Sequence, residues 1–437
     1  MRRAITAIVA IGLLVAGSYG LHALTETPET APPSAFEQTP IPRLGEVERL
    51  ISVFEERVAE NGDPLDMSEL GRLYLERAEL VDDLGDYGSA IDSLEKSVDL
   101  APEDQVAGLR LAQSYLAVHR FDEALGLASS LAASDSTDAA AQLVVADAQF
   151  ELGDAKAAAG ALEKVAALTG EIPEILTRRA QHADSMGDVP AALGYAEEAL
   201  RITETEGSEL RRLAFHLTFA AHFLNDLGRY EQAETMLNRA IEADPTWSSS
   251  RATLGAVLMS DGRLEEALTA YEGAASLSPD PGTLAILGDL SVALGDERRA
   301  EAFYDQVEPA ASETPIHQDA YRRTLAQFLA DHALEAERAV ELAEVDVSQR
   351  SDPFGLDTYA WALYRAGRVE EARSQMDKVF DVGLREPQIL YHSGLIALAE
   401  GNEKQARLEL SEALDKAPMF HPLQAPHAKS VLESLEG

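Results

Sequence analysis

Apolar residues recur at helical spacing from residue 43 to the end of the chain, in a series of short runs. The first run, 44–60, shows the pattern clearly, with apolar side chains at Leu44, Val47, Leu50, Ile51, Phe54 and Val58. Later runs come in pairs, and in most pairs a glycine followed by a polar residue separates the two members. This pattern predicts many short helices joined by tight turns.

The residues that separate the two runs of a pair recur with a regular period, close to that of known two-helix repeats. They are Gly85, Gly153, Gly187, Gly228, Gly262, Gly295, Gly367 and Gly401, and His119 holds the same slot between the first two. Glycine adopts the left-handed backbone conformation at little cost, so each is expected to end the first helix of its pair. A fixed period of this kind predicts a repeat architecture rather than two or three globular domains.

Small residues stand at two fixed positions around each turn. On the N-terminal side of the turn lie Ala78, Ala112, Ala146, Ala180, Ala221, Gly255, Gly288, Ala360 and Gly394. On its C-terminal side lie Ala90, Ala124, Ala158, Ala192, Ala233, Ala267, Ala300, Ala372 and Ala406. One set falls on the first helix and the other on the second, so the two helices of each pair are expected to cross closely at these points.

Two segments around these turns, LGDYGSAIDSLEKSVDLAP (84–102) and LGRYEQAETMLNRAIEADP (227–245), closely resemble the tetratricopeptide-repeat family. The resemblance covers roughly 71–420, or ten units. It implies an all-α, right-handed superhelical solenoid of helix-turn-helix repeats. The WALYRAG segment (361–367) and the ending are similar to those of long, membrane-targeted bacterial tetratricopeptide proteins of unassigned activity.

The ends of the array predict capping helices, because an open apolar face of a solenoid would otherwise meet water. We expect an N-terminal capping helix and connection at 43–70, the repeats at 71–420 and a C-terminal capping helix at 421–437. Two units depart from the pattern. The fourth carries extra residues near Thr203–Glu209, in a longer helix or a loop, and the eighth, near 317–352, has Asp331 and His332 where a turn glycine is expected.

The N-terminus has the pattern of a targeting segment. Arg2 and Arg3 precede an apolar run at 4–24, the order found in signal peptides and signal anchors, and the run is long enough to span a bilayer as a helix. Either a cleaved signal or an uncleaved anchor would send the remaining chain to the outer side of the cytoplasmic membrane. Residues 25–42 are rich in Pro, Thr and Glu and predict an extended linker. We therefore expect an extracytoplasmic protein, anchored in the membrane or periplasmic.

Composition narrows the possible functions. The chain of 437 residues holds 36 basic and 76 acidic residues, a net charge of −40, which disfavours nucleic-acid binding. It has no cysteine, which excludes disulfides and thiolate metal sites. No Ser-His-Asp order, zinc-protease motif or phosphate-binding loop appears. The sequence predicts no catalytic residue, no cofactor and no metal site, and it predicts other proteins as partners.

Family members commonly bind peptide segments on the surface lined by the first helices. Counting from the turns, the densest aromatic stretch of that surface is predicted at Tyr321, Phe328, Phe354, Trp361, Tyr364 and Tyr391. Trp and Tyr are over-represented among residues that dominate binding energy, which favours a partner-binding groove here. The alternative is that these rings pack on neighbouring repeats.

A second inner cluster contains His222, Asn225 and Asp226, which either bind a polar ligand or form a solvated face. His421 and His427 in FHPLQAPH are a weak metal signal, and a turn into the last helix accounts for them better. The preferred function is a non-catalytic protein-interaction scaffold. The alternative is a container for a small ligand or metal, or an accessory subunit of an enzyme.

Overall fold

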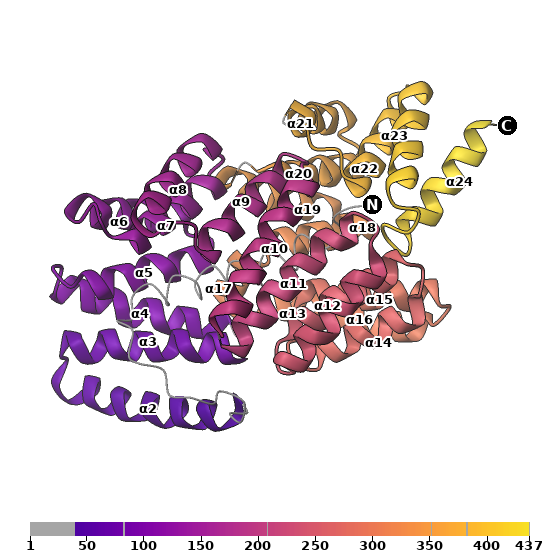
Figure 1. The fold of residues 1–437 in the computed structure, drawn as a ribbon. Helices are drawn as coiled ribbons and strands as arrows, with labels where there is room; N and C mark the ends of the chain where they lie inside the picture. The colour runs from indigo at the N-terminus through magenta and orange to yellow at the C-terminus, as the bar shows by residue number, and fades with distance from the viewer. Residues whose placement is uncertain (1–39, 82–83, 208, 351, 382, 437) are drawn as a thin grey trace. The chain divides into compact units, whose positions relative to one another are not determined.

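The computed structural model describes residues 40–81, 84–207, 209–350, 352–381 and 383–436. Within these ranges the chain forms 23 helices and no strand (Figure 1). The predicted targeting segment and most of the linker lie outside the described residues. The all-helical prediction is confirmed.

Twenty of the helices form ten antiparallel pairs, numbered here from the first to the tenth. The first five pairs are α3 (Pro64–Val81) with α4 (Leu84–Leu100), α5 (Gln105–Ala117) with α6 (Phe121–Ser134), α7 (Ala139–Glu151) with α8 (Ala155–Thr169), α9 (Pro173–Ser185) with α10 (Val189–Glu206), and α11 (Leu210–Asp226) with α12 (Tyr230–Ala243). The last five are α13 (Ser248–Ser260) with α14 (Leu264–Ala275), α15 (Pro281–Ala293) with α16 (Glu297–Ala311), α18 (Arg322–Asp331) with α19 (Ala336–Gln349), α20 (Pro353–Arg365) with α21 (Val369–Asp381), and α22 (Pro387–Ala399) with α23 (Glu403–Lys416). A short helix, α17 (Pro315–Ala320), precedes the eighth pair.

Turn residues and helix caps explain where these helices begin and end. Seven of the eight predicted glycines take a positive φ, and His119 takes one of 62° in the same slot. Aspartates then cap the following helices, as Asp154 and Asp296 do by accepting a hydrogen bond from a backbone N–H in the first turn. Part of the acidic surplus therefore serves helix initiation.

Three details of the sequence prediction change. Gly85 does not end a helix, because it lies in the first turn of α4. The extra residues of the fourth pair lengthen its second helix, α10, which ends at the left-handed Gly207. The turn of the eighth pair is not at Asp331 and His332, because the residue with positive φ in the glycine slot is Ala333.

The predicted small residues lie where the two helices of each pair cross. All the alanines of the two sets are buried, with at most 4% of their surface exposed. At Gly255 a Cβ atom would lie 2.5 Å from the Tyr271 ring of the partner helix, so only glycine fits there without a shift. Close approach at these points explains why small side chains recur with the period of the repeat.

The two terminal helices cover the ends of the array. Val47 and Ile51 of α2 (Pro40–Asn61) are buried against Leu70 and Leu73 of α3, as expected for an N-terminal cap. Helix α24 (Gln424–Glu436) follows α23 and contacts both α22 and α23. The array thus begins at Pro64, ahead of residue 71, and its first helix is covered by α2.

The described residues divide into two compact units. The C-terminal unit comprises the described parts of 176–313 and 321–437, and the N-terminal unit comprises the described part of 11–175 with 314–320. Within the C-terminal unit the first helices of the last four pairs contact one another in the order α15, α18, α20, α22. Their shared surface, called the inner face below, carries the candidate site.

Candidate functional site on the inner face

The position of the turn in the eighth pair decides which side chains belong to the inner face. Ala333 lies one repeat period before Gly367, so the slots of Asp357 and Trp361 in α20 correspond to Arg323 and Gln327 in α18. The sequence had placed Tyr321 and Phe328 in the inner slots. Tyr321 is instead a buried residue at the start of α18, and the Phe328 ring packs 5.7 Å from that of Tyr304 in α16.

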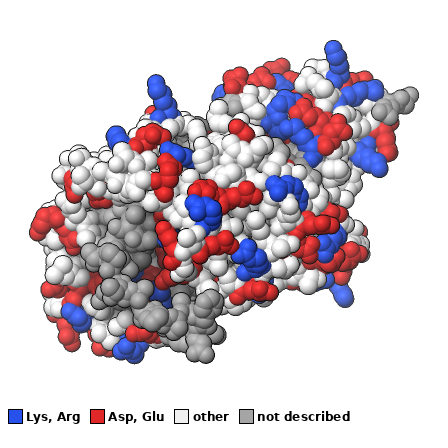
Figure 2. Space-filling view, in the orientation of Figure 1, with Lys and Arg blue, Asp and Glu red and all other residues white. Residues whose placement is uncertain are grey.

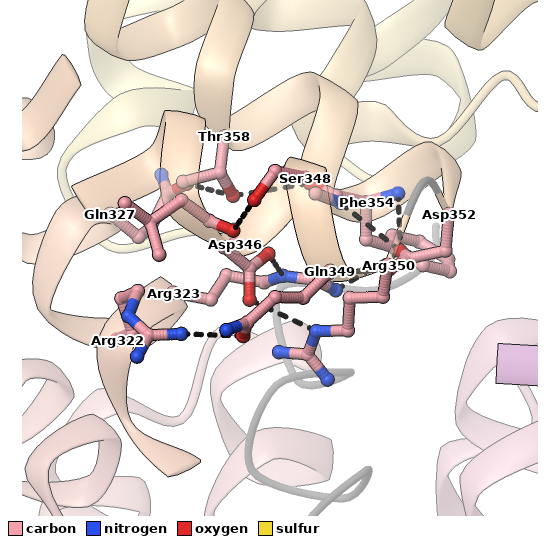
Figure 3. A network of polar contacts seen from close by, with 12 residues as sticks. Arg322, Arg323, Gln327, Asp346, Ser348, Gln349, Arg350, Asp352, Phe354 and Thr358 are labelled. Atoms are coloured by element: carbon pink, nitrogen blue, oxygen red, sulfur yellow. Dashed lines mark hydrogen bonds and ion pairs between the residues drawn. The ribbon is translucent and has the colours of Figure 1, made fainter. Parts of the chain in front are cut away.

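Arg323 is the centre of the ion cluster in Figure 3. Its Nε donates to Asp346 Oδ2 at 2.7 Å, and its two Nη atoms bond the carboxylate of Asp352. Arg350 adds a second contact to Asp346, at 3.0 Å. Asp352 in turn caps α20 by accepting from the backbone N–H groups of Phe354 and Gly355. The cluster therefore fixes the start of α20 against α18 and α19.

The charges of this cluster stabilise one another. Burial alone would disfavour the charged guanidinium of Arg323, but the carboxylates of Asp346 and Asp352 outweigh burial and raise its pKa. Burial likewise opposes ionisation of Asp346, and the adjacent Arg323 and Arg350 outweigh that effect and lower its pKa. The cluster therefore has a structural role, in which paired charges hold α18, α19 and the start of α20 together. Counting one repeat period back from Gly367 was the signal that could have found Arg323 and Gln327 in the sequence.

The predicted aromatic row is mostly packed inside the inner face. Trp361 is 1% exposed; its indole stacks 5.0 Å from Tyr364 and 4.3 Å from His392. Its Nε1 donates to Asp331 Oδ1 at 2.8 Å. Tyr391 is also buried, with its ring 5.9 Å from Trp361, whereas Phe354 and Tyr364 are half-buried. Of the six predicted residues, these last two offer the accessible surface.

Carboxylates and imidazoles line the same face. Asp357 lies 3.0 Å from His392 Nδ1. Asp289 of α15 accepts from the Tyr304 hydroxyl at 2.7 Å, and its Oδ1 lies 3.4 Å from His332 Nε2. Burial raises the pKa of Asp289, but the hydrogen bond and charge of His421, together with His332 and Tyr304, outweigh it and lower that pKa. The spacing from Gly367 placed Asp357 on the inner face, but nothing in the sequence marked Asp357 or Asp289 as a hydrogen-bond acceptor.

The turn between α23 and α24, together with the first residues of α24, contacts Asp289, Asp331 and Tyr391 on the inner face. His421 Nε2 lies 3.1 Å from Asp289 Oδ2, Gln424 Nε2 donates to Asp331 Oδ1 at 2.8 Å, and His427 Nδ1 lies 2.8 Å from the Tyr391 hydroxyl. His421 Nδ1 also accepts from the backbone N–H groups of Leu423 and Gln424. His421 thus lies in the turn that precedes α24, and His427 lies within α24 itself.

Family models agree with this geometry. A tetratricopeptide-repeat model matches residues 83–148, and a second one matches 224–282 and 360–418. The chain is a tetratricopeptide-repeat protein. No curated protein matches its sequence.

Solved structures similar to this tetratricopeptide-repeat protein are distant. Yeast Tom70 has a TM-score of 0.39 at 14% identity, over 97% of this chain and 96% of Tom70. A human IFIT1 dimer with PPP-AAAA has a TM-score of 0.47 at 15% identity, over 92% of this chain and 94% of IFIT1. PilF of Pseudomonas aeruginosa has a TM-score of 0.39 at 15% identity, over 50% of this chain and 96% of its own. Such low identities and TM-scores give no information on what this protein binds.

The surface of this tetratricopeptide-repeat protein mixes both charges. On the face drawn in Figure 2, Lys and Arg are interspersed with Asp and Glu. Arg263, for example, directly before α14, pairs with Glu234 of α12 and Glu266 of α14. Within the described ranges no group of three or more potential metal ligands gathers. None of the described helices is both long and apolar enough to span a bilayer.

The second predicted cluster lies on α11 in the same unit. His222, Asn225 and Asp226 are all buried, with His222 Nε2 3.6 Å from Asp226 Oδ2. Thr218, one turn earlier, shares a 3.0 Å hydrogen bond with Ser250 of α13. These side chains are packed between first helices rather than solvated, and their role in binding a polar ligand stays a prediction.

The buried side chain of His216, on the same helix, should make the folded protein less stable in acid, and this loss of stability tests the packing of α11. It is 3% exposed, and burial, with repulsion from Arg212, lowers its pKa from 6.5 to about 3. Between these values the unfolded chain binds a proton that the folded protein does not, so stability falls as the pH drops below 6.5, by about 1.4 kcal/mol per pH unit. From pH 7 to pH 5 this amounts to about 2 kcal/mol.

Replacing His216 by Gln should therefore reduce the loss of unfolding free energy between pH 7 and pH 5 by about 2 kcal/mol relative to wild type. Chemical unfolding followed by circular dichroism at both pH values measures the difference. The matched control is His182→Gln, a half-buried histidine of α9 in the same unit. Equal losses in wild type and His216→Gln would contradict the expected acid sensitivity of this site.

Proposed function

We propose that the protein is a non-catalytic scaffold that binds segments of partner proteins on the inner face of α18, α20 and α22. One observation carries the proposal: this face already holds a segment of polypeptide, residues 420–427, through side-chain hydrogen bonds and ring contacts. A surface that accommodates one such segment has the shape and the hydrogen-bonding groups to accommodate another. The half-buried rings of Phe354 and Tyr364 on α20 add accessible aromatic surface to the same face.

The proposed location is the outer side of the cytoplasmic membrane. It is supported by the sequence of the N-terminus, where Arg2 and Arg3 precede the apolar run 4–24 and a Pro-rich linker follows. The expected partners are envelope proteins. Neither nucleic acid nor a cofactor is expected to take part, given the net charge of −40 and the lack of a catalytic constellation.

Capture of partners from an envelope extract tests the proposal. Tyr364→Ala is the informative variant, because this ring is half-buried and stacks on Trp361 without being the centre of the packing. Loss of a hot-spot aromatic ring should weaken partner binding by about 2 kcal/mol, or about thirtyfold. The measurement is quantitative mass spectrometry of proteins retained by wild type and variant.

Tyr359→Ala provides the matched control. Tyr359 is also half-buried on α20, but the charged groups near it are Glu344, Arg368 and Glu371. The proposal requires that Tyr359→Ala retains the partners that Tyr364→Ala loses. Equal retention by all three proteins would place binding on another surface, and a thermal shift with small molecules or metals would instead favour the container function.

A further inference from the structure

The C-terminal segment, defined here as residues 420–428, reaches further than a cap requires. In a solenoid each repeat contacts its neighbours, and a terminal cap needs to cover only the last pair, here α22 and α23. This segment also reaches α18 in the eighth pair, through Gln424, and α15 in the seventh, through His421. All these residues belong to the C-terminal unit. Capping alone does not explain contacts three pairs back.

Three side chains of the segment each face one polar group on a different first helix. Three evenly spaced side chains, His421, Gln424 and His427, face Asp289, Asp331 and the Tyr391 hydroxyl, one on each of three first helices. Gln424 shares Asp331 Oδ1 with Trp361. Ala425 and Ala428, each directly after one of these side chains, are buried, so small residues let the segment approach closely. His421 lies in the turn before α24, whereas Gln424 and His427 lie at the start of that helix, so a turn and the first residues of a helix present the three side chains.

We propose that the inner face of α15, α18 and α22 is a recognition site for a helix-starting segment with hydrogen-bond donors at positions i and i+3 and a side chain at i+6 that shares a hydrogen bond with the Tyr391 hydroxyl. The C-terminal segment fills this site in cis, and a partner segment of the same chemistry must displace it. The inference rests on the proposed function, because it names the ligand and the regulation of that face. Asp289 and Asp331 are the acceptors, so imidazole, amide or basic side chains suit the anchor positions.

Tethering sets how strongly the segment competes. An occupant linked by a short stretch of chain acts at an effective concentration on the order of millimolar, so a free peptide at micromolar concentration cannot displace it. Release of the tethered segment removes this competition. The apparent affinity for a free peptide should then rise by tenfold or more, because the gain is about the ratio of chains with the segment bound to chains with the site vacant. The wild-type chain is therefore expected to bind the peptide weakly.

Gln424→Glu in the full chain is designed to release the segment without altering the receiving helices. The new carboxylate would face Asp331 Oδ1, where Gln424 now donates a hydrogen bond. A fluorescent peptide of residues 417–437 should then bind the variant at least about tenfold more tightly than wild type. Faster hydrogen exchange in 420–436 should accompany release. Gln306→Glu, which introduces the same charge at an exposed site on α16, should behave as wild type.

Two further measurements separate recognition from loss of structure. The peptide carrying Glu at position 424 should not bind the released chain. Tyr391→Phe removes only the hydroxyl that meets His427, so it should weaken peptide binding to the Gln424→Glu chain by about threefold to tenfold. In an otherwise wild-type chain it should also speed exchange of residues 420–428. That last readout holds even if Gln424→Glu fails to fold.

The proposal is overturned if exchange shows the segment released and the peptide still does not bind, or if Tyr391→Phe leaves exchange of 420–428 unchanged. Either result would make the segment a terminal cap with no recognition site beneath it. Peptide binding without any envelope partner would sustain this recognition site while removing the scaffold function. Partner capture that neither Gln424→Glu nor Tyr391→Phe changes would sustain the scaffold function and remove this recognition site.

Discussion

An arginine in place of Ala267 is expected to unfold the sixth helix pair and to loosen the pairs on either side. Ala267 has no exposed surface and lies on α14, which packs closely against α13 around Gly255. Overpacking costs about 1–3 kcal/mol, and removing a guanidinium from water adds several more, so the total is about 5 kcal/mol. Because the stability of a solenoid is a sum over repeats and their interfaces, the loss should begin locally.

Helix content from circular dichroism and hydrogen exchange by mass spectrometry measure this effect. Exchange should rise first in α13 and α14, then in α11–α12 and α15–α16, which contact that pair. The control is Thr269→Arg, two residues away on an exposed part of α14. If Ala267→Arg proves as stable as Thr269→Arg, the assignment of these positions to the helix crossing is wrong.

Ala267 also illustrates why the fold could be predicted from sequence. Each crossing imposes a local steric condition, a small residue on each helix, and each turn favours a left-handed residue. Both conditions repeat with a fixed spacing, so they are visible in one sequence without knowledge of distant contacts. His119 and Ala333 mark the limit of this reasoning, because a turn can place a non-glycine residue at positive φ.

The eighth pair shows how a small irregularity misdirects a prediction. Its second-helix alanine, Ala339, is buried one position further from Ala333 than the other alanines are from their turns, and Glu335 also has a positive φ. The turn is one residue longer than in the other pairs. Counting back from Asp331 and His332 therefore assigned Tyr321 and Phe328 to the inner face. Counting back from Ala333, the turn residue in the structure, assigns Arg323 and Gln327 instead.

The contacts of the candidate site were beyond sequence reasoning for a different cause. Gln424 and Asp331 are 93 residues apart, and nothing in the local pattern distinguishes a carboxylate that accepts a buried hydrogen bond from one in water. In a chain with 76 acidic residues, Asp289 and Asp331 do not stand out. Helix periodicity predicts which residues are buried, but it does not predict which buried polar groups meet.

Replacing Trp361 by Ala is expected to destabilise the C-terminal repeats by about 3–5 kcal/mol. The sequence alone left open whether this ring binds a partner or packs on neighbouring repeats. The structure favours packing, because the indole is 1% exposed and stacks on both Tyr364 and His392. Its removal leaves a cavity among three first helices. Thermal unfolding should show the loss, and hydrogen exchange should place it in α18, α20 and α22.

Trp361→Phe separates the packing of the ring from its hydrogen bond. Phenylalanine retains most of the stack but lacks the Nε1 donor, so Asp331 Oδ1 keeps only the hydrogen bond from Gln424. The expected cost is about 1–2 kcal/mol. Because the same oxygen holds the C-terminal segment, exchange should rise in 420–428 as well as in α20. Trp247→Phe, on the sixth pair, should change exchange only near α11–α14, where Trp247 contacts Phe215. A response of the C-terminal segment to Trp247→Phe but not to Trp361→Phe would show that Asp331 does not couple the segment to the inner face.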